Sequence, residues 1–149
     1  MPASKKPIAK KKKVVPKATR MRRLLKKCHE AWSLVVRLRD KTCRRCGAEG
    51  NLAAHHWIVS KARSRQDRFN PANGAALDYG CHIRVIHNEA SYANAVALYN
   101  KMLETVPEQE ILDVLARAGQ ESPPFTEEGL TETLRNLELM AAELQKEGK

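Results

Sequence analysis

Hydrophobic residues recur with helical spacing between Thr19 and Asp40, the first strongly patterned segment of the chain. The apolar positions fall on one face and lysines and arginines on the other, as in an amphipathic helix. The apolar face consists of Leu24, Leu25, Trp32, Val35, Val36 and Leu38. The sequence therefore predicts a basic amphipathic helix that ends near Asp40.

Two short strands are predicted after this helix. Residues 52–59 (LAAHHWIV) form a short apolar run typical of a strand. A polar, arginine-rich loop follows and ends at Asn73-Gly74, a dipeptide that indicates a turn. Residues 75–77 (AAL) are then suited to return as the second strand.

Helices are predicted for most of the rest of the chain. One begins around Cys81, and amphipathic segments follow over residues 91–106 and 108–119, the last closed by a glycine. After a proline-containing linker, the final helix has an acidic background and a leucine stripe at Leu130, Leu134, Leu137 and Leu144. Such a stripe either docks a partner or packs on its own domain, and packing is the commoner outcome. Together with the two strands, these helices predict an α+β fold.

Composition divides the chain into three predicted parts. Residues 1–18 are rich in lysine and proline with little to bury, which predicts a disordered basic arm. Residues 19–106 are the predicted central domain, and residues 107–149 a C-terminal helical extension. No apolar run has the length of a signal peptide or a membrane span, so a soluble intracellular protein without a membrane partner is expected.

The net charge of +10 is distributed unevenly. Residues 1–30 contain twelve lysines and arginines against one acid, and residues 31–103 contain eleven against five. Residues 104–149 reverse the balance, with four against eleven. A basic front half that continues into the central domain favours a nucleic-acid partner over a merely solvated tail.

Four cysteines are too few for a disulfide scaffold in a chain of 149 residues, so thiols or metal ligands are expected. Cys43 and Cys46 form a Cys-x2-Cys pair with glycines nearby for the turns. Cys81 lies where a second pair would end, but Asp78 stands where that pair would begin. Cys28 falls inside the first predicted helix, where a cysteine usually packs.

Taken in order, the motifs CRRCG, LAAHHWIV, NPANGAAL and GCHIRVIH resemble the HNH endonucleases, the ββα-metal or His-Me finger nucleases, over about residues 28–104. The similarity is strongest to small phage and prophage members that have a zinc knuckle around the active site. It implies a ββα-metal core for the central domain, flanked by the basic helix and the C-terminal helices. It also implies metal-dependent hydrolysis of DNA by nicking or double-strand cutting, with low sequence specificity.

His55 and His56 are neighbours on a predicted strand, so their side chains leave it in opposite directions and a division of labour is expected. Carried over from the family, His55 binds the catalytic divalent ion (Mg²⁺, Mn²⁺ or another transition metal) and His56 is the general base. His82 matches the helix histidine that completes the metal site. Asn73 matches the asparagine that ties the loop together and orients the base.

Two positions depart from the family pattern. The second helix histidine is expected four residues after His82, but His87 is five residues on and lies about 140° around a regular helix. It is a metal ligand only if the helix is irregular, and otherwise contacts phosphate or solvent. The structural zinc would be held by Cys43, Cys46, Cys81 and the carboxylate of Asp78, which zinc accepts but binds less tightly than thiolate. The alternatives are a site that has lost zinc, or Cys28 as a substitute ligand.

Four cations in the loop after the catalytic strand are predicted to contact DNA phosphates: Lys61, Arg63, Arg65 and Arg68. The family resemblance alone implies a cytoplasmic role in a bacterial host, in phage genome processing or packaging with a terminase partner. A non-catalytic DNA-binding zinc-knuckle adaptor with a degenerate site is the alternative, and an RNA-directed enzyme is a third hypothesis.

Overall fold

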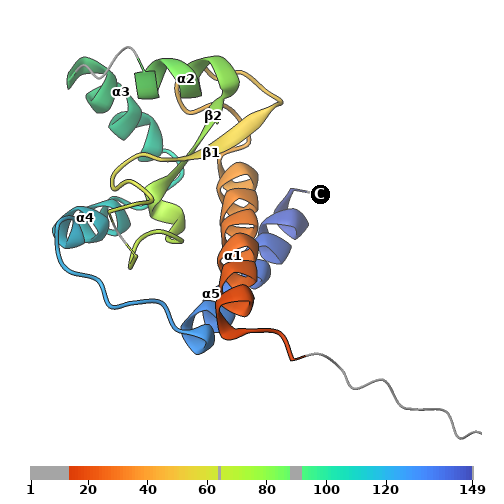
Figure 1. The fold of residues 1–149 in the computed structure, drawn as a ribbon. Helices are drawn as coiled ribbons and strands as arrows, with labels where there is room; N and C mark the ends of the chain where they lie inside the picture. The colour runs from red at the N-terminus through yellow and green to blue at the C-terminus, as the bar shows by residue number, and fades with distance from the viewer. Residues whose placement is uncertain (1–13, 64, 88–91, 149) are drawn as a thin grey trace, which may run out of the picture.

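The computed structural model describes residues 14–63, 65–87 and 92–148, and it confirms an α+β fold that is mostly helical (Figure 1). The elements in chain order are α1 (Lys17–Asp40), β1 (Leu52–His56), a 3-10 turn (Pro71–Asn73), β2 (Gly74–Asp78), α2 (Tyr79–His87), α3 (Tyr92–Met102), α4 (Glu108–Arg117) and α5 (Glu127–Glu147). Of the predicted basic arm, residues 1–13 lie outside the described residues, and Lys17 already belongs to α1. Within the described parts of the chain, no helix is both long and apolar enough to span a membrane.

The two strands form one antiparallel sheet at the centre of the molecule. Leu52 pairs with Asp78 at one end, and His56 pairs with Gly74 at the other. β1 ends at His56, three residues earlier than predicted, because the next backbone groups bond elsewhere. The amides of Ile58 and Val59 both donate to the side chain of Asn73 rather than to a partner strand.

A turn is present where Asn73-Gly74 predicts one, because the Gly74 amide donates to the Pro71 carbonyl and closes the 3-10 turn, but the glycine itself does not adopt a turn conformation. Gly74 has φ −112° and ψ 138°, which is extended backbone, and it is the first residue of β2. A Cβ atom at this position would lie 2.8 Å from Cζ2 of Trp32 and also press into the side chain of Val36. The glycine is therefore required by the close approach of α1 to the sheet and not by a turn.

α1 is the central helix and packs on two partners. Its predicted limits are confirmed to within two residues. One side meets α5, and their shared core contains Cys28, Trp32, Val35, Val36, Leu130, Leu137 and Ala141. The leucine stripe of the last helix thus packs on its own chain. The end of α1 is fixed to β2, since the buried Asp40 carboxylate accepts a hydrogen bond from the Ala76 amide at 2.8 Å.

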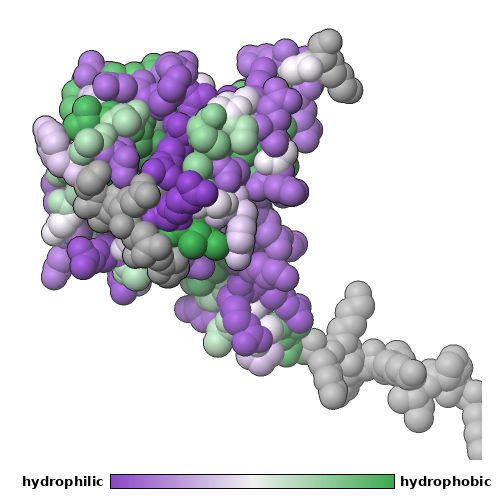
Figure 2. Space-filling view, turned by 90° about the horizontal axis from the view of Figure 1, so that it is seen from above, coloured by the Kyte–Doolittle hydropathy of each residue, from purple (hydrophilic) through white to green (hydrophobic). Residues whose placement is uncertain are grey.

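A second core joins the other helices to the loop between the strands. Met102 of α3 packs with Ile111 and Val114 of α4. The Arg117 guanidinium at the end of α4 donates to the buried Asp67 carboxylate at 2.7 Å, which fixes α4 to the loop. From above, hydrophilic side chains cover most of the visible surface and hydrophobic ones form smaller areas (Figure 2).

Candidate metal and catalytic site

His55 and His82 meet on one side of the sheet. His55 is the fourth residue of β1 and His82 the fourth residue of α2, and their ring centroids are 5.1 Å apart. Burial, with further contributions from His82 and His56, lowers the pKa of His55 to about 4. The ring is therefore neutral at pH 7, which is the form that binds a metal ion.

The spacing of these two rings fits one shared ion. Imidazole nitrogens bind divalent metals at about 2.0–2.1 Å, so two rings on one ion have centroids about 5 Å apart. The observed separation of 5.1 Å between His55 and His82 agrees with that value. The separation of the two rings is therefore compatible with a shared divalent ion.

His56 points to the opposite side of the sheet, toward α1. Its ring stacks on Trp32 with centroids 4.1 Å apart and an interplanar angle of 16°. Its Nε2 lies 2.8 Å from the carbonyl oxygen of Arg68. A carbonyl oxygen only accepts hydrogen bonds, so Nε2 carries the proton and Nδ1 is the basic nitrogen. Burial lowers the pKa of His56, while the Arg68 carbonyl opposes this shift.

Asn73 is fully buried and holds the loop between the strands together. Its Oδ1 accepts from the amides of Ile58 and Val59 at 3.1 and 2.9 Å. Its Nδ2 donates to the carbonyl oxygens of Val59 and Asp67 at 2.9 and 3.1 Å. Asp67 directly precedes Arg68, and the Arg68 carbonyl oxygen accepts a hydrogen bond from His56. Asn73 therefore acts on His56 through the loop backbone.

His29 lies beside His56 and was not predicted as a site residue. Its ring centroid is 6.2 Å from that of His56 and 5.5 Å from that of Trp32. Burial lowers the pKa of His29, and the charges of Lys61 and Arg68 lower it further. The only signal in the sequence was its position three residues before Trp32, which gives no hint of a contact with a strand 27 residues later.

The four loop cations predicted to contact DNA lie in different environments. Lys61 and Arg68 are close enough to His56 to lower its pKa. Arg68 is half-buried and packs over the rings of Phe69 and Phe125 at 5.3 and 5.8 Å. Arg65 is exposed and donates to the carbonyl of Ser122 at 3.5 Å, and Arg63 is exposed as well.

Cys43, Cys46, Asp78 and Cys81 form a cluster whose ligand atoms all lie within 4.8 Å of one another. A zinc ion bound at about 2.3 Å from sulfur requires neighbouring ligand atoms about 3.8 Å apart. Small side-chain movements would shorten the distances between the ligand atoms to this value. Thiolates together with a carboxylate are a set of ligands that zinc accepts. The cluster could therefore bind a metal ion such as zinc.

Asp78 uses its two oxygens differently. Oδ1 accepts from the amides of Gly80 and Cys81 at 2.8 and 3.2 Å, which caps the first turn of α2. Oδ2 accepts from the Cys46 thiol at 3.0 Å. Thiol donors, Cys81 first, hold the pKa of Asp78 well below its usual range. One oxygen thus serves the helix while the other faces the sulfur atoms.

Two further candidate ligands, His87 and Cys28, have different outcomes. α2 ends at His87, whose side chain lies outside the described residues. Cys28 is buried in the core between α1 and α5, where its thiol donates to the Leu130 carbonyl at 3.3 Å. Its burial raises its pKa, and it is not a member of the cysteine and aspartate cluster.

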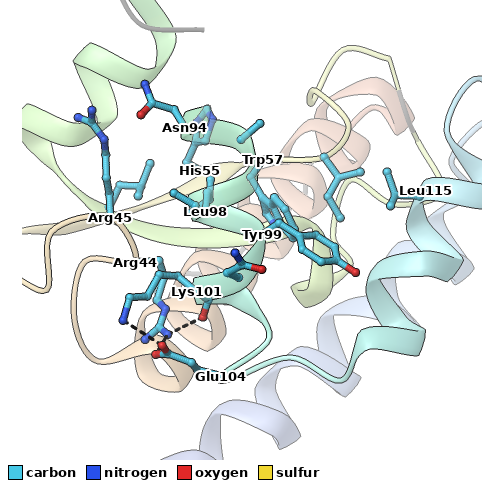
Figure 3. A pocket seen from close by; sticks show the side chains of 15 residues that line it. Arg44, Arg45, His55, Trp57, Asn94, Leu98, Tyr99, Lys101, Glu104 and Leu115 are labelled. Atoms are coloured by element: carbon cyan, nitrogen blue, oxygen red, sulfur yellow. Dashed lines mark hydrogen bonds and ion pairs between the residues drawn. The ribbon is translucent and has the colours of Figure 1, made fainter. Parts of the chain in front are cut away.

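A pocket of about 620 Å³ opens next to His55, with Leu98 and Tyr99 of α3 among the residues that line it (Figure 3). Arg44, between the first two cluster cysteines, is buried at its base. Its guanidinium donates to the Lys101 carbonyl and to Glu104, each at 2.7 Å. The cysteine segment is thus fixed to the end of α3, and His55 borders an opening rather than a closed core.

Comparison with known proteins assigns no family to this chain. No family model, no curated protein and no solved structure matches it. The geometry of the described side chains is therefore the basis for proposing a function.

Proposed function

We propose that this protein is a metal-dependent endonuclease of the HNH type that hydrolyses phosphodiester bonds in DNA. The observation that carries the proposal is the division of labour between adjacent histidines. His55 meets His82 with a spacing that suits a shared ion, whereas His56 is fixed through Nε2 with a basic Nδ1. A metal ligand and a general base are the two functions that phosphodiester hydrolysis requires of such a pair.

The arrangement of elements supports the same family. Two antiparallel strands joined by a long loop lead directly into α2, and β1 and α2 contribute the histidines that the HNH resemblance assigns. Asn73 occupies the matching position in the loop and holds it with four hydrogen bonds. We therefore interpret β1, β2 and α2 as the ββα-metal core.

In the proposed reaction, Nδ1 of His56 takes a proton from a water molecule while the water oxygen forms a bond to phosphorus. The bond from phosphorus to the 3′ oxygen breaks and this oxygen takes up a proton from a second water molecule, which leaves 5′-phosphate and 3′-hydroxyl ends. His55 and His82 would hold a divalent ion, which would supply positive charge at the phosphate and the leaving oxygen. Arg68 and Trp32 keep the His56 ring in place, through the carbonyl bond and the stacking contact.

We further propose that the cluster of Cys43, Cys46, Asp78 and Cys81 binds a structural zinc ion. Its ligands come from the segment before β1 and from the junction of β2 and α2, so the ion would join both sides of the core. Metal analysis of protein purified without added metal tests this idea. About one tightly held zinc per chain is the expected result, and a folded chain without zinc would contradict it.

A plasmid-nicking assay with Mg²⁺ or Mn²⁺ tests the nuclease proposal. His56→Ala should lower the cleavage rate by about 10²–10⁴-fold, the usual contribution of a general base. Leu139→Ala, which changes a side chain that is 55% exposed on α5, is the control and should cleave normally. DNA binding without metal-dependent cleavage by the wild type would instead favour the non-catalytic adaptor.

The resemblance also suggests a biological role, in phage genome processing or packaging with a terminase partner in the bacterial cytoplasm. That part of the proposal depends on the resemblance alone. Preferential cleavage of structured RNA in the same assay would redirect the proposal to an RNA substrate.

A further inference from the structure

The exposed side of α1 is strongly basic. The only acid on this side is Glu30, because the helix's other acid, Asp40, is buried. Arg20 is already paired with Glu127 of α5. The remaining exposed cations of the helix are Lys17, Arg22, Arg23, Lys26, Lys27 and Arg37. This surface lies outside the strands and α2, and the proposed chemistry does not use it.

Two of these cations form a row with His29, and the row leads to the proposed catalytic centre. At 100° per residue, Arg22, Lys26 and His29 lie within about 60° of one another on the helix. Trp32 and Val36, next to this row, pack against the first residue of β2. The row, hereafter the α1 cationic row, therefore runs along the edge of α1 nearest the sheet.

His29 connects the row to the catalytic histidine. Its ring centroid lies 6.2 Å from that of His56. Lys61 and Arg68 are within electrostatic reach of both rings. His29 thus lies between the cations of the loop around His56 and the exposed cations of α1.

We propose that the α1 cationic row binds the phosphate backbone of DNA that flanks the scissile phosphate. The inference rests on the proposed function in one respect, because His56 defines where cleavage occurs. From Arg22 to His29 the helix rises about 10 Å, which equals about three base steps of a DNA strand. Lys26 pairs with Glu30 at 3.7 Å, but the two side chains are 78% and 62% exposed, so this pair does not withhold Lys26 from a phosphate.

The test compares two variants with equal changes in charge. Arg22→Gln/Lys26→Gln alters the row, and Arg135→Gln/Lys146→Gln removes two exposed cations from α5. Binding of the full chain to a labelled DNA duplex is measured by fluorescence anisotropy over a range of KCl concentrations, without Mg²⁺ or Mn²⁺. Thermal unfolding of both variants should match the wild type, because all four side chains are exposed.

Each lost phosphate contact lowers the salt dependence of log K by about 0.9, so the row variant should lose about 1.8. That change corresponds to about thirtyfold weaker binding at 0.15 M salt if the contacts contribute nothing at 1 M. The α5 variant should bind within about twofold of the wild type. Unchanged binding by the row variant, or equal weakening of both variants, overturns the proposal.

Two outcomes separate this inference from the nuclease proposal. If the wild type does not cleave with either metal but the row variant still loses binding, the nuclease proposal is rejected and the proposed DNA-binding role of the row is supported. If the wild type cleaves and the row variant binds DNA normally, only the proposed role of the row is rejected. Tighter binding of a matched RNA duplex than of DNA overturns the assignment of DNA as the partner.

Discussion

Asn73 offers the sharpest test of how the loop controls the proposed catalytic histidine. Replacing it with alanine removes partners from four backbone groups, the amides of Ile58 and Val59 and the carbonyls of Val59 and Asp67. The site is fully buried, so water replaces these partners poorly. At about 1 kcal/mol per hydrogen bond, Asn73→Ala should lower the free energy of unfolding by about 4 kcal/mol. That is a large share of the roughly 5–15 kcal/mol typical of a domain.

Asn73→Asp refines the test because it keeps the shape of the side chain. The carboxylate retains an acceptor for the two amides but faces two carbonyl oxygens without a proton to donate. Burial and these oxygens should raise the pKa of the new carboxyl group in the folded protein. The stability of this variant relative to the wild type should therefore be greatest at low pH and decrease as pH rises through that pKa.

Urea unfolding followed by tryptophan fluorescence measures both variants, since Trp32 and Trp57 flank the loop. Asn136→Ala, an exposed change on α5, is the control and should alter stability by less than about 0.5 kcal/mol. Cleavage is measured on the same samples under conditions where each is folded. A variant at Asn73 that loses cleavage but less than about 1 kcal/mol of stability would falsify the view that the residue acts through the loop.

Three further predictions concern the packing around the site. Gly74→Ala should destabilise the fold by about 1–3 kcal/mol in thermal unfolding, because its Cβ presses into α1, and adding Val36→Ala should restore part of the loss. Arg117→Ala leaves the buried Asp67 carboxylate without its cation, so a loss of about 3–5 kcal/mol is expected in urea unfolding, and a loss below about 1 kcal/mol would contradict it. The pKa of His29 is depressed in the folded state, so the unfolded chain takes up the proton first as pH falls below about 6.5. Between pH 7.5 and 5.5, the wild type should therefore lose more stability than His29→Gln, a difference that urea titrations at several pH values will reveal.

The long elements were predictable because their hydrophobic patterns are local. The apolar spacing of α1 fixed its end at Asp40, and Gly119, with φ 87°, ends the helical segment where the sequence indicated. The end of β1 was less predictable. Residues 57–59 are apolar enough to extend a strand, but their amides are needed by the 3-10 turn and Asn73. The end of β1 therefore depends on Asn73, which lies fifteen residues after Ile58 in the sequence.

Contacts of α1 with the sheet could not be predicted from the sequence. In the sequence, Trp32 is one more apolar position of an amphipathic helix. In the structure, its ring stacks on His56 and its Nε1 donates to the Asn70 carbonyl at 3.0 Å. Gly74 was interpreted as a turn residue because Asn-Gly favours turns, whereas the structure uses the missing Cβ to admit Trp32. Both facts arise from packing between segments that are 24 to 42 residues apart, and no local pattern encodes them.

Asp78 shows how a departure from a family pattern can have a local cause. The predicted start of α2 at Cys81 concealed the role of this aspartate, because a helix that starts at Tyr79 makes Asp78 its capping residue. A cysteine there could face the other sulfur atoms but would leave the first amides of α2 without an acceptor. The carboxylate can serve both, with one oxygen on the helix and one toward the cluster. Since α2 also carries His82, the residue expected to weaken zinc binding is the same one that fixes the helix holding half of the proposed catalytic metal site.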